Sequence, residues 1–285
     1  MVVLSRTHAI TAECVAAHYD DLDVPYRDLW GEHLHHGLWM RGDETAEEAA
    51  RALVDLVAGW AEIRAGDAVA DVGCGYGATA RILAREHGAS VIGYTVSRAQ
   101  AQWAKSRCNA PSDPRVILGD WLANELPDES QDAVLAIESV EHMVDRETFF
   151  RQAHRVLRPG GRIVLCAWLA RESAPAWARR HLLEPIVREG RLADLPTSRM
   201  HEDSLARAGF GAIERRDLTR RVQRTWSVCL LRLLQRALRD GAFRRRFLTQ
   251  SSEGRAFAAA IPRLWIAYRS GSMGYEILRA RKPAA

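Results

Sequence analysis

The chain has 285 residues, 47% hydrophobic and 27% charged, a composition typical of an ordinary globular protein. No apolar run approaches the roughly 18 residues of a membrane span, and Arg6, His8 and Glu13 interrupt the region where a secretory signal would lie. The net charge of +4 is only a weak indication of nucleic-acid binding, and none of the five cysteines forms a C-x-x-C pair. We therefore expect a reduced, cytoplasmic protein without a zinc site or disulfide framework.

The predicted elements begin with a helix whose apolar residues recur from Ala50 to Trp60, with Asp43 as its expected N-cap. After it, short apolar runs alternate with amphipathic stretches. We expect strands at Ala68–Val72, Ser90–Gly93, Val116–Leu118, Ala133–Ile137 and Ile163–Ala167. We expect helices at Ala78–Arg85, Ser97–Cys108 and Glu147–Val156, and a turn at Leu157–Gly161.

This alternation predicts an α/β fold with a Rossmann-like, mostly parallel sheet and helices on both faces. Two late strands, Gly211–Arg216 and Tyr275–Ala280, would bring the sheet to seven strands. The stretch Thr225–Tyr268 between them is predicted to be a helical cap inserted between the last two strands. We expect one structural domain with a helical lid at 1–60, a core at 61–170, and the remaining strands with the cap (225–268) at 171–285.

The first strand runs into a glycine-rich turn, Asp71–Gly77, which would let the backbone approach a ligand closely at the start of a helix. With Ala78 the turn also satisfies the relaxed dinucleotide-binding pattern, so a dehydrogenase is one alternative. The second strand, however, ends in Gly93–Ser97, without an acidic residue to bind a ribose diol. Asp120 and Trp121 instead follow the third strand, where a carboxylate and an indole suit the amino group and ring of adenine.

Four segments in this order, Asp71–Gly77, Asp120, Glu138–Met143 and Leu157–Gly161, resemble the motifs of the class I S-adenosylmethionine-dependent methyltransferases. The stretch Val91–Gln100 resembles the tocopherol, sterol, cyclopropane-fatty-acid and prenyl-diphosphate branch of small-molecule methyltransferases, where Thr and Gln replace the usual acid. The resemblance implies S-adenosyl-L-methionine as cofactor. The implied cofactor-binding residues are Asp71, Gly73, Gly75, Gly77, Thr95, Gln100, Asp120, Trp121 and Glu138.

The segment Glu138–Met143 follows the fourth strand, and the resemblance places it beside the sulfonium of the cofactor. Because the cofactor is already activated, the enzyme must mainly orient the reactants and exclude water. His142 is a candidate catalytic base for an acceptor that loses a proton, and Glu141 is a candidate to steady or deprotonate a carbocation. The structural alternative is that His142 caps the next helix and Glu141 pairs with an arginine.

The segment from Tyr19 to Trp39 is dense in aromatic residues and histidines, and it resembles the segment of this branch that folds over the cofactor and faces the acceptor. A packed N-terminal arm is the alternative. No HExxH helix or suitably spaced carboxylate accompanies the histidines, so we expect no metal. The candidate acceptor-binding residues are Tyr26, His35 and His36 here and Trp226 and Trp265 in the cap, where Leu230, Leu231, Leu234 and Tyr268 are further apolar candidates.

The basic residues are almost all arginine, since only Lys105 and Lys282 among the 40 are lysines. A GC-rich gene explains such a bias, but arginine also binds anions in a bidentate manner. The arginines in and around the cap are Arg215, Arg216, Arg220, Arg221, Arg224, Arg232, Arg236, Arg239, Arg244, Arg245 and Arg246. An acceptor with a diphosphate or carboxylate would be held there, although a solvated helix face explains most of these arginines equally well.

We therefore expect a methyltransferase acting on a lipophilic or aromatic small molecule in natural-product biosynthesis, with carbon methylation of a prenyl, terpenoid or aromatic acceptor favoured. The first alternative is an enzyme of the same fold that keeps the cofactor and cyclises a polyketide or terpene. The second is oxygen or nitrogen methylation. RNA methylation is disfavoured because the basic and aromatic interleaving of a strand-binding groove is missing. We expect no nucleic-acid partner and no membrane span, and the sequence leaves the oligomeric state open.

Overall fold

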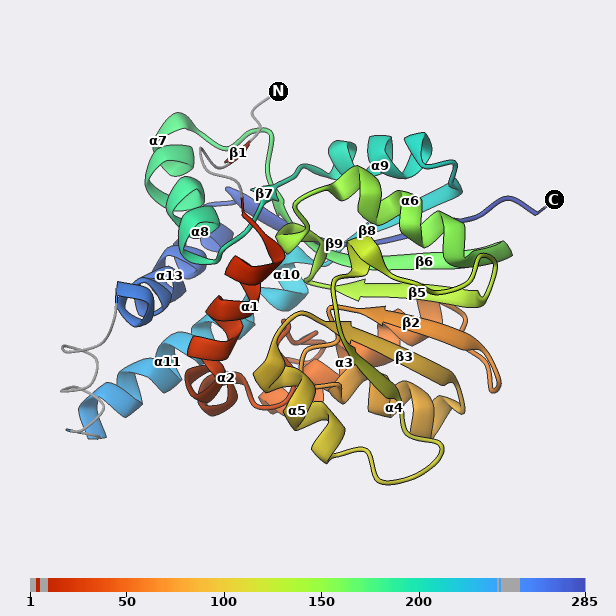
Figure 1. The fold of residues 1–285 in the computed structure, drawn as a ribbon. Helices are drawn as coiled ribbons and strands as arrows, with labels where there is room; N and C mark the ends of the chain where they lie inside the picture. The colour runs from red at the N-terminus through yellow and green to blue at the C-terminus, as the bar shows by residue number, and fades with distance from the viewer. Residues whose placement is uncertain (1–3, 6–9, 240, 242–251, 285) are drawn as a thin grey trace.

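A seven-stranded sheet forms the centre of the computed structural model, which describes residues 4–5, 10–239, 241 and 252–284. The strands stand in the order β4-β3-β2-β5-β6-β9-β8 (Figure 1). Their bounds are β2 (Ala68–Val72), β3 (Ser90–Thr95), β4 (Arg115–Leu118), β5 (Gln131–Ile137), β6 (Leu157–Ala170), β8 (Gly211–Asp217) and β9 (Met273–Arg281). Only β9 runs against its neighbours, so the predicted Rossmann-like, mostly parallel sheet is confirmed.

Helices cover both faces of this sheet (Figure 1). One face carries α3 (Ala46–Trp60), α4 (Ala78–His87) and α5 (Arg98–Ser106), and the other carries α6 (Arg146–Val156) and α9 (Ser198–Arg207). Leu53 and Leu83 belong to the buried cluster on the first face, and Phe149 and Leu205 to the cluster on the second. Because the central strands are buried on both sides, they are continuous apolar runs rather than alternating ones.

Three further segments gather beyond the carboxyl ends of the parallel strands, at the left of Figure 1. The first consists of α1 (Ala12–Asp21) and α2 (Asp23–Trp30). The second follows β6 and consists of α7 (Ala176–Ala178), a π-helical turn (Arg179–Leu183), α8 (Glu184–Glu189) and β7 (Asp194–Leu195), which pairs with β1 (Leu4–Ser5). The third lies between β8 and β9 and consists of α10 (Thr219–Val222), α11 (Arg224–Arg239) and α13 (Ser252–Arg269).

The third segment is the helical cap that the sequence predicts, now seen as separate helices rather than one stretch. Residues 240 and 242–251, with the predicted anion-binding candidates Arg244, Arg245 and Arg246, lie outside the described residues. The second segment was predicted only as irregular and helical, without bounds, because its short helices have no extended period of apolar residues. No helix within the described ranges is long and apolar enough to cross a membrane.

The predicted N-cap of α3 was wrong. Thr45, rather than Asp43, accepts the Glu48 backbone N–H, and the Glu48 side chain in turn accepts the Thr45 backbone N–H. This capping box satisfies two otherwise unpaired helix donors at once, which a lone aspartate placed two residues earlier does not do. The Asp43 carboxylate instead pairs with the exposed Arg41.

The prediction of a turn at Leu157–Gly161 was also wrong, because these residues belong to the strand β6. The pairing with β5 passes from Gln131 opposite Leu157 to Ala133 opposite Arg162, so the intervening residues form an irregularity within the strand. Gly160 lies there with a φ of +77°, a backbone conformation that favours glycine. The Pro and Gly residues therefore mark a bulge in a strand rather than its beginning.

The capping box yields a stability prediction. Thr45→Ala should lower the free energy of unfolding by about 1 kcal/mol, because a helix donor loses its partner. Asp43→Ala is the matched control and should leave the stability nearly unchanged, since the ion pair of Asp43 with Arg41 is exposed. Urea denaturation of both variants checks this, and an equal loss in the control would contradict the assignment.

Candidate active site

Two cavities meet at the carboxyl edge of the sheet. The first, of about 940 Å³, is lined by the turn after β2, the ends of β3, β4 and β5, α1, and the strap, a name used here for residues 31–39. The second, of about 790 Å³, is lined by α1, α2, the segment after β6 and the cap. Tyr19, Leu34, Glu138 and His142 line both cavities, so they mark the junction between them.

The glycine turn forms the floor of the first cavity because its backbone approaches the next strand connection closely. Gly73 has a φ of +76°, and a Cβ on it would lie 2.3 Å from the Cβ of Ser139. The Ser139 hydroxyl donates to the Val72 carbonyl at 2.6 Å, which joins the two loops. Gly75 also lines the cavity, whereas Gly77 caps α4 with a φ of +72° and lies outside the lining.

Asp71 presents a buried carboxyl group to the first cavity, and its Oδ2 has no hydrogen-bond partner. Burial raises the pKa of this carboxyl to about 7. An unpaired, buried carboxyl is costly unless a cation or a donor completes it. The group therefore fits a ligand that brings a positive charge or a donor into this part of the cavity.

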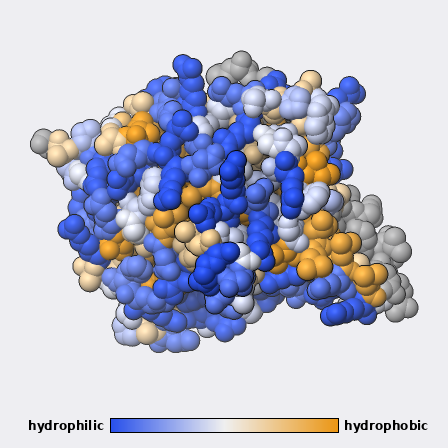
Figure 2. Space-filling view, turned by 180° about the vertical axis from the view of Figure 1, so that it is seen from behind, coloured by the Kyte–Doolittle hydropathy of each residue, from blue (hydrophilic) through white to orange (hydrophobic). Residues whose placement is uncertain are grey.

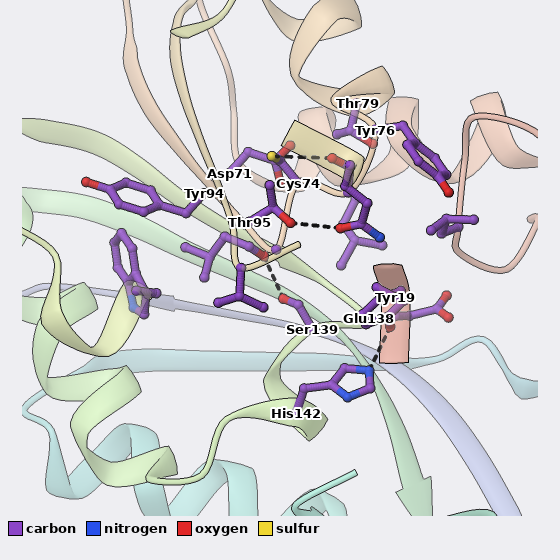
Figure 3. A pocket seen from close by; sticks show the side chains of 18 of the residues that line it. Tyr19, Asp71, Cys74, Tyr76, Thr79, Tyr94, Thr95, Glu138, Ser139 and His142 are labelled. Carbon is purple, nitrogen blue, oxygen red and sulfur yellow. Dashed lines mark hydrogen bonds between the residues drawn. The ribbon is translucent and has the colours of Figure 1, made fainter. Parts of the chain in front are cut away.

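Thr95 and Gln100 both line the first cavity, and Figure 3 shows the position of Thr95 in it. The Thr95 hydroxyl donates to Gln100 Oε1 at 2.8 Å and accepts the Ser97 N–H at 3.2 Å. The two side chains thus orient one another, and the amide nitrogen of Gln100 keeps its donors for a ligand.

Asp120 and Trp121 line the first cavity in different ways. Asp120 begins the short 3-10 helix η1 (Trp121–Ala123), where its Oδ1 accepts the Leu122 N–H at 2.9 Å. Its other oxygen has no such bond to the backbone of η1 and is suited to accept from a ligand. The Trp121 ring is almost completely buried and packs edge-on against Tyr94, so it supports this wall from behind.

Glu138 follows β5 with a φ of +54° and is the most heavily hydrogen-bonded side chain at the junction. Its Oε1 accepts from the His36 N–H and the Tyr275 hydroxyl, both at 2.7 Å. Its Oε2 accepts from His36 Nδ1 at 2.9 Å and from the Trp168 indole at 2.7 Å. Since a carboxylate offers about four acceptor positions, this one is occupied within the protein, and any contact of Glu138 with the cofactor would involve its other atoms.

The ionisation of Glu138 follows from this environment. Burial raises the pKa of the carboxyl, but the neighbouring His36 and its hydrogen bonds outweigh burial, and the pKa lies below its ordinary value. Glu138 is therefore a buried carboxylate that ties the strap to the ends of β5, β6 and β9.

His142 ends the short 3-10 helix η2 (Val140–His142), and Figure 3 shows its ring directed toward Tyr19. Its Nε2 lies 2.9 Å from the Tyr19 hydroxyl, and its Nδ1 lies 3.1 Å from the Arg191 carbonyl oxygen. Burial lowers the pKa of the imidazole and raises the pKa of the Tyr19 hydroxyl. The pair is thus a neutral histidine facing a neutral tyrosine at the junction of the cavities.

Glu141 lines the second cavity and differs from Glu138 in its protonation. Its Oε1 accepts the Trp168 backbone N–H, and its Oε2 has no partner. Burial raises the pKa of this carboxyl to about 8, so it carries a proton at neutral pH. Neither it nor His142 adopts the structural alternative considered from the sequence, since Glu141 pairs with no arginine among the described residues and His142 bonds to Tyr19 and Arg191.

The predicted acceptor-binding residues are distributed unevenly. Tyr26, His36 and Trp226 line the second cavity, whereas His35 lines the first. Trp265 lines neither, because its indole donates to Ser227 and joins the cap helices to one another.

Two apolar candidates in the cap face outward. Leu231 and Leu234 are 55% and 52% exposed on α11, where Figure 2 shows apolar side chains gathered beside the grey atoms. They do not form an acceptor wall. Tyr268 is buried and packs against His36, and Leu230 is half-buried in the adjoining core.

Neither cavity is lined by an arginine or lysine from the described part of the chain. Arg215 pairs with Glu202 and Glu276, and Arg236 pairs with Asp28. The strap histidines bond to one another and to the backbone, with His33 Nδ1 3.1 Å from His35 Nε2. No group of metal-ligating side chains was found among the described residues.

Sequence reasoning missed three residues of the junction. Tyr19 lies in the aromatic segment that was singled out, but only the fold brings it to His142. Tyr275 was assigned only to a strand and Trp168 to no element, and no local pattern shows that both donate to Glu138.

The sheet order, the glycine turn and the cavity at the carboxyl edge define the fold of a class I S-adenosylmethionine-dependent methyltransferase. A family model described as mycolic acid cyclopropane synthetase matches residues 6–242, and the chain belongs to that family. It is an S-adenosylmethionine-dependent methyltransferase of the small-molecule, natural-product type. The buried, unpaired carboxyl of Asp71 and the close-packed glycine turn fit this cofactor.

Three similar proteins illustrate the range of the family. The 27-O-demethylrifamycin SV methyltransferase of Amycolatopsis mediterranei is 35% identical over 93% of this chain and 95% of its own. The (+)-O-methylkolavelool synthase of Herpetosiphon aurantiacus is 31% identical over 74% of this chain and 75% of its own. The crystal structure of the cyclase SpnF has a TM-score of 0.80 at 27% identity and covers 99% of both chains.

Asp71 makes cofactor binding depend on pH. Its carboxyl is half protonated near pH 7, and the ammonium of the cofactor should bind only the carboxylate. Affinity for S-adenosylhomocysteine, measured by calorimetry, should therefore increase about tenfold from pH 6 to pH 8. Asp71→Asn should bind more weakly at pH 8 and lose this increase; an unchanged slope in the variant would assign the titration to another group.

Asp120 is predicted to accept a hydrogen bond from the adenine amino group. Asp120→Ala should weaken S-adenosylhomocysteine binding by about 1–3 kcal/mol. Asp55→Ala removes a carboxylate from the surface of α3, where it pairs with Arg51, and should not change affinity. Equal affinities of the two variants, with folding checked by circular dichroism, would refute the contact.

Proposed function

We propose that the enzyme transfers the methyl group of S-adenosylmethionine to a hydroxyl oxygen of an uncharged, lipophilic small molecule in the second cavity. The observation that carries this proposal is the His142–Tyr19 pair at the junction, with His142 Nε2 2.9 Å from the tyrosine hydroxyl. A hydroxyl acceptor that enters the junction meets a neutral imidazole beside the first cavity.

The chemistry of an alcohol or phenol acceptor matches this arrangement. Methyl transfer forms an oxygen–carbon bond, breaks the sulfur–carbon bond of the cofactor, and leaves one proton on the acceptor oxygen to be removed. His142 Nε2 takes that proton, directly or through the Tyr19 hydroxyl, and burial keeps the imidazole unprotonated until then by lowering its pKa. The cofactor supplies the activated methyl group, and the chain orients the acceptor and excludes water.

The state of Glu141 favours oxygen over an alkene carbon. Methylation of an alkene produces a carbocation, which a nearby carboxylate would steady. Burial raises the pKa of Glu141 to about 8, so at neutral pH this carboxyl is uncharged. The ionised Glu138 also lines this cavity, but protein donors occupy its oxygens. The carbon methylation favoured by the sequence thus has less support than oxygen methylation.

The lining of the second cavity favours an uncharged acceptor. Aromatic rings from Tyr19, Tyr26, Trp30, Trp168 and Trp226 surround it, together with aliphatic side chains. A diphosphate would enter without a described arginine or lysine to pair it and would approach the carboxylate of Glu138. Such an acceptor is therefore disfavoured, and an aromatic or alicyclic hydroxyl compound fits best.

The strap and α1 act as the lid over the cofactor. Asp20 accepts from the Ser97 hydroxyl and the Ala99 N–H, and the Tyr76 hydroxyl donates to Asp23 at 2.7 Å. The strap is further held to α11, since Thr225 accepts from the Gly37 N–H at 3.0 Å. These bonds close the first cavity on the side away from the sheet and protect the sulfonium from water.

Two relatives support oxygen as the target. The 27-O-demethylrifamycin SV methyltransferase and the (+)-O-methylkolavelool synthase are both named for a methyl group on oxygen. The likeness to SpnF, a cyclase, favours a second candidate in which the cofactor is retained and the bound molecule is cyclised.

The test is incubation with S-adenosylmethionine carrying a ¹³C methyl group and a panel of neutral hydroxylated naphthalenes, anthraquinones and macrolides. The expected product gains one methylene unit in mass, and its NMR spectrum shows an oxygen-bound methyl. A carbon-bound methyl would overturn the assignment, whereas a rearranged product of unchanged mass would favour cyclisation.

His142→Ala should lower kcat about 10²–10⁴-fold, because it removes the base. Tyr19→Phe should lower kcat less, since the imidazole remains. His181→Ala, on the exposed surface of the segment after β6, is the control and should keep full activity. Activity of His142→Ala equal to that of the control would show that the reaction does not use this base.

A further inference from the structure

The loop 190–193, which connects α8 to β7, binds two consecutive residues of the site through its backbone. The Ala193 N–H donates to the Glu141 carbonyl at 2.7 Å, and the Arg191 carbonyl lies 3.1 Å from His142 Nδ1. Gly190 and Leu192 from the same loop line the second cavity. One short loop therefore contacts both the imidazole and the space for the acceptor.

The contact with Arg191 decides which nitrogen of His142 carries the proton. A carbonyl oxygen can only accept, so Nδ1 must be the N–H of a neutral imidazole. The lone pair then lies on Nε2, which faces the Tyr19 hydroxyl and accepts from it. Burial lowers the pKa of His142 and so keeps the ring in a neutral form, where the choice of tautomer matters.

The backbone at Arg191 explains the direction of its carbonyl. Arg191 has a φ of +52°, in the left-handed region that non-glycine residues rarely occupy. It directly follows Gly190, which caps α8. The next residue, Leu192, donates its N–H to the Val187 carbonyl at 3.0 Å, so Arg191 is the left-handed residue that ends α8, and the helix end fixes its conformation.

We propose that the Arg191 backbone carbonyl is the positioning group of the active site: it holds His142 in the tautomer protonated on Nδ1, and the left-handed backbone at Arg191 aims it. The reacting hydroxyl, the imidazole and this carbonyl form a triad, in which the carbonyl takes the position that an aspartate has in many hydrolytic enzymes. The inference rests on the proposed role of His142 as the base.

Its consequence is that acceptor binding and base orientation depend on the same loop. Leu192 stands between the two residues whose backbone groups hold Glu141 and His142, and it lines the acceptor cavity. An acceptor that packs against Leu192 therefore contacts the loop whose backbone groups orient the base.

The test is the ring ¹⁵N spectrum of the full-length protein with labelled histidines, bound to S-adenosylhomocysteine at pH 7.5. Comparison with His142→Gln assigns the His142 signals. We expect a protonated Nδ1 and an unprotonated Nε2, the opposite of the tautomer that free histidine prefers in water. A His142 signal with the proton on Nε2 would overturn the inference outright.

Three variants separate the contributions. Arg191→Gly is the matched control, because glycine adopts the left-handed conformation freely and should leave the tautomer unchanged. Arg191→Val disfavours that conformation, so the peptide should turn and the ring should shift toward the Nε2-protonated form. Tyr19→Phe should keep the proton on Nδ1, whereas a change there would assign the choice of tautomer to the tyrosine and refute the proposal.

These outcomes do not depend on the acceptor. If Arg191→Val does not fold, the wild type and Tyr19→Phe still decide the matter. Because the spectra require no methyl transfer, they can refute the predicted tautomer of His142 while oxygen methylation stands. They can also confirm that tautomer if the reaction proves to be a cyclisation, so failure of the inference is distinguishable from failure of the proposed function.

Discussion

The carboxylate of Glu138 is the point on which the site depends. It accepts four hydrogen bonds from groups on the strap, β6 and β9, which are far apart in the sequence. Burial of a charge is tolerated only when hydrogen-bond donors surround it. Removal of one donor destabilises the folded protein, because the charge is then buried without a full set of partners. The strap is therefore fixed to the sheet edge by the same carboxylate that marks the junction of the two cavities.

Around this anchor, neighbouring groups of the same type take different charge states. Glu138 is ionised because donors surround it, while Glu141, three residues later, is held protonated by burial beside another carboxylate. Directly after Glu141 in the chain, His142 is kept neutral by burial and oriented by a backbone carbonyl. This separation of ionisation states by environment lets acidic and basic roles coexist within one short segment.

In the proposed function, the sheet supplies the cofactor half of the site, and the added segments supply the acceptor half. The ends of β2, β3, β4 and β5 line the first cavity, as expected for an open α/β sheet. The second cavity is built from helices that precede the sheet, follow β6 and separate β8 from β9. Acceptor preference can therefore change by altering these segments while the cofactor half is retained, which agrees with the variety of reactions named among the relatives.

The sequence by itself determined the sheet and its glycine turn, because apolar periodicity and turn residues act locally and in chain order. The class of cofactor followed from the resemblance of four ordered motifs to those of a known family. The sequence also singled out Asp71, Thr95, Gln100 and Asp120, which line one cavity because parallel strands end at one edge of the sheet. Only the tertiary structure decided that Tyr19 meets His142 across 123 positions and that Glu138 is an anchor. Contacts between distant segments leave no spacing pattern, and charge states follow burial, which exists only once the chain is folded.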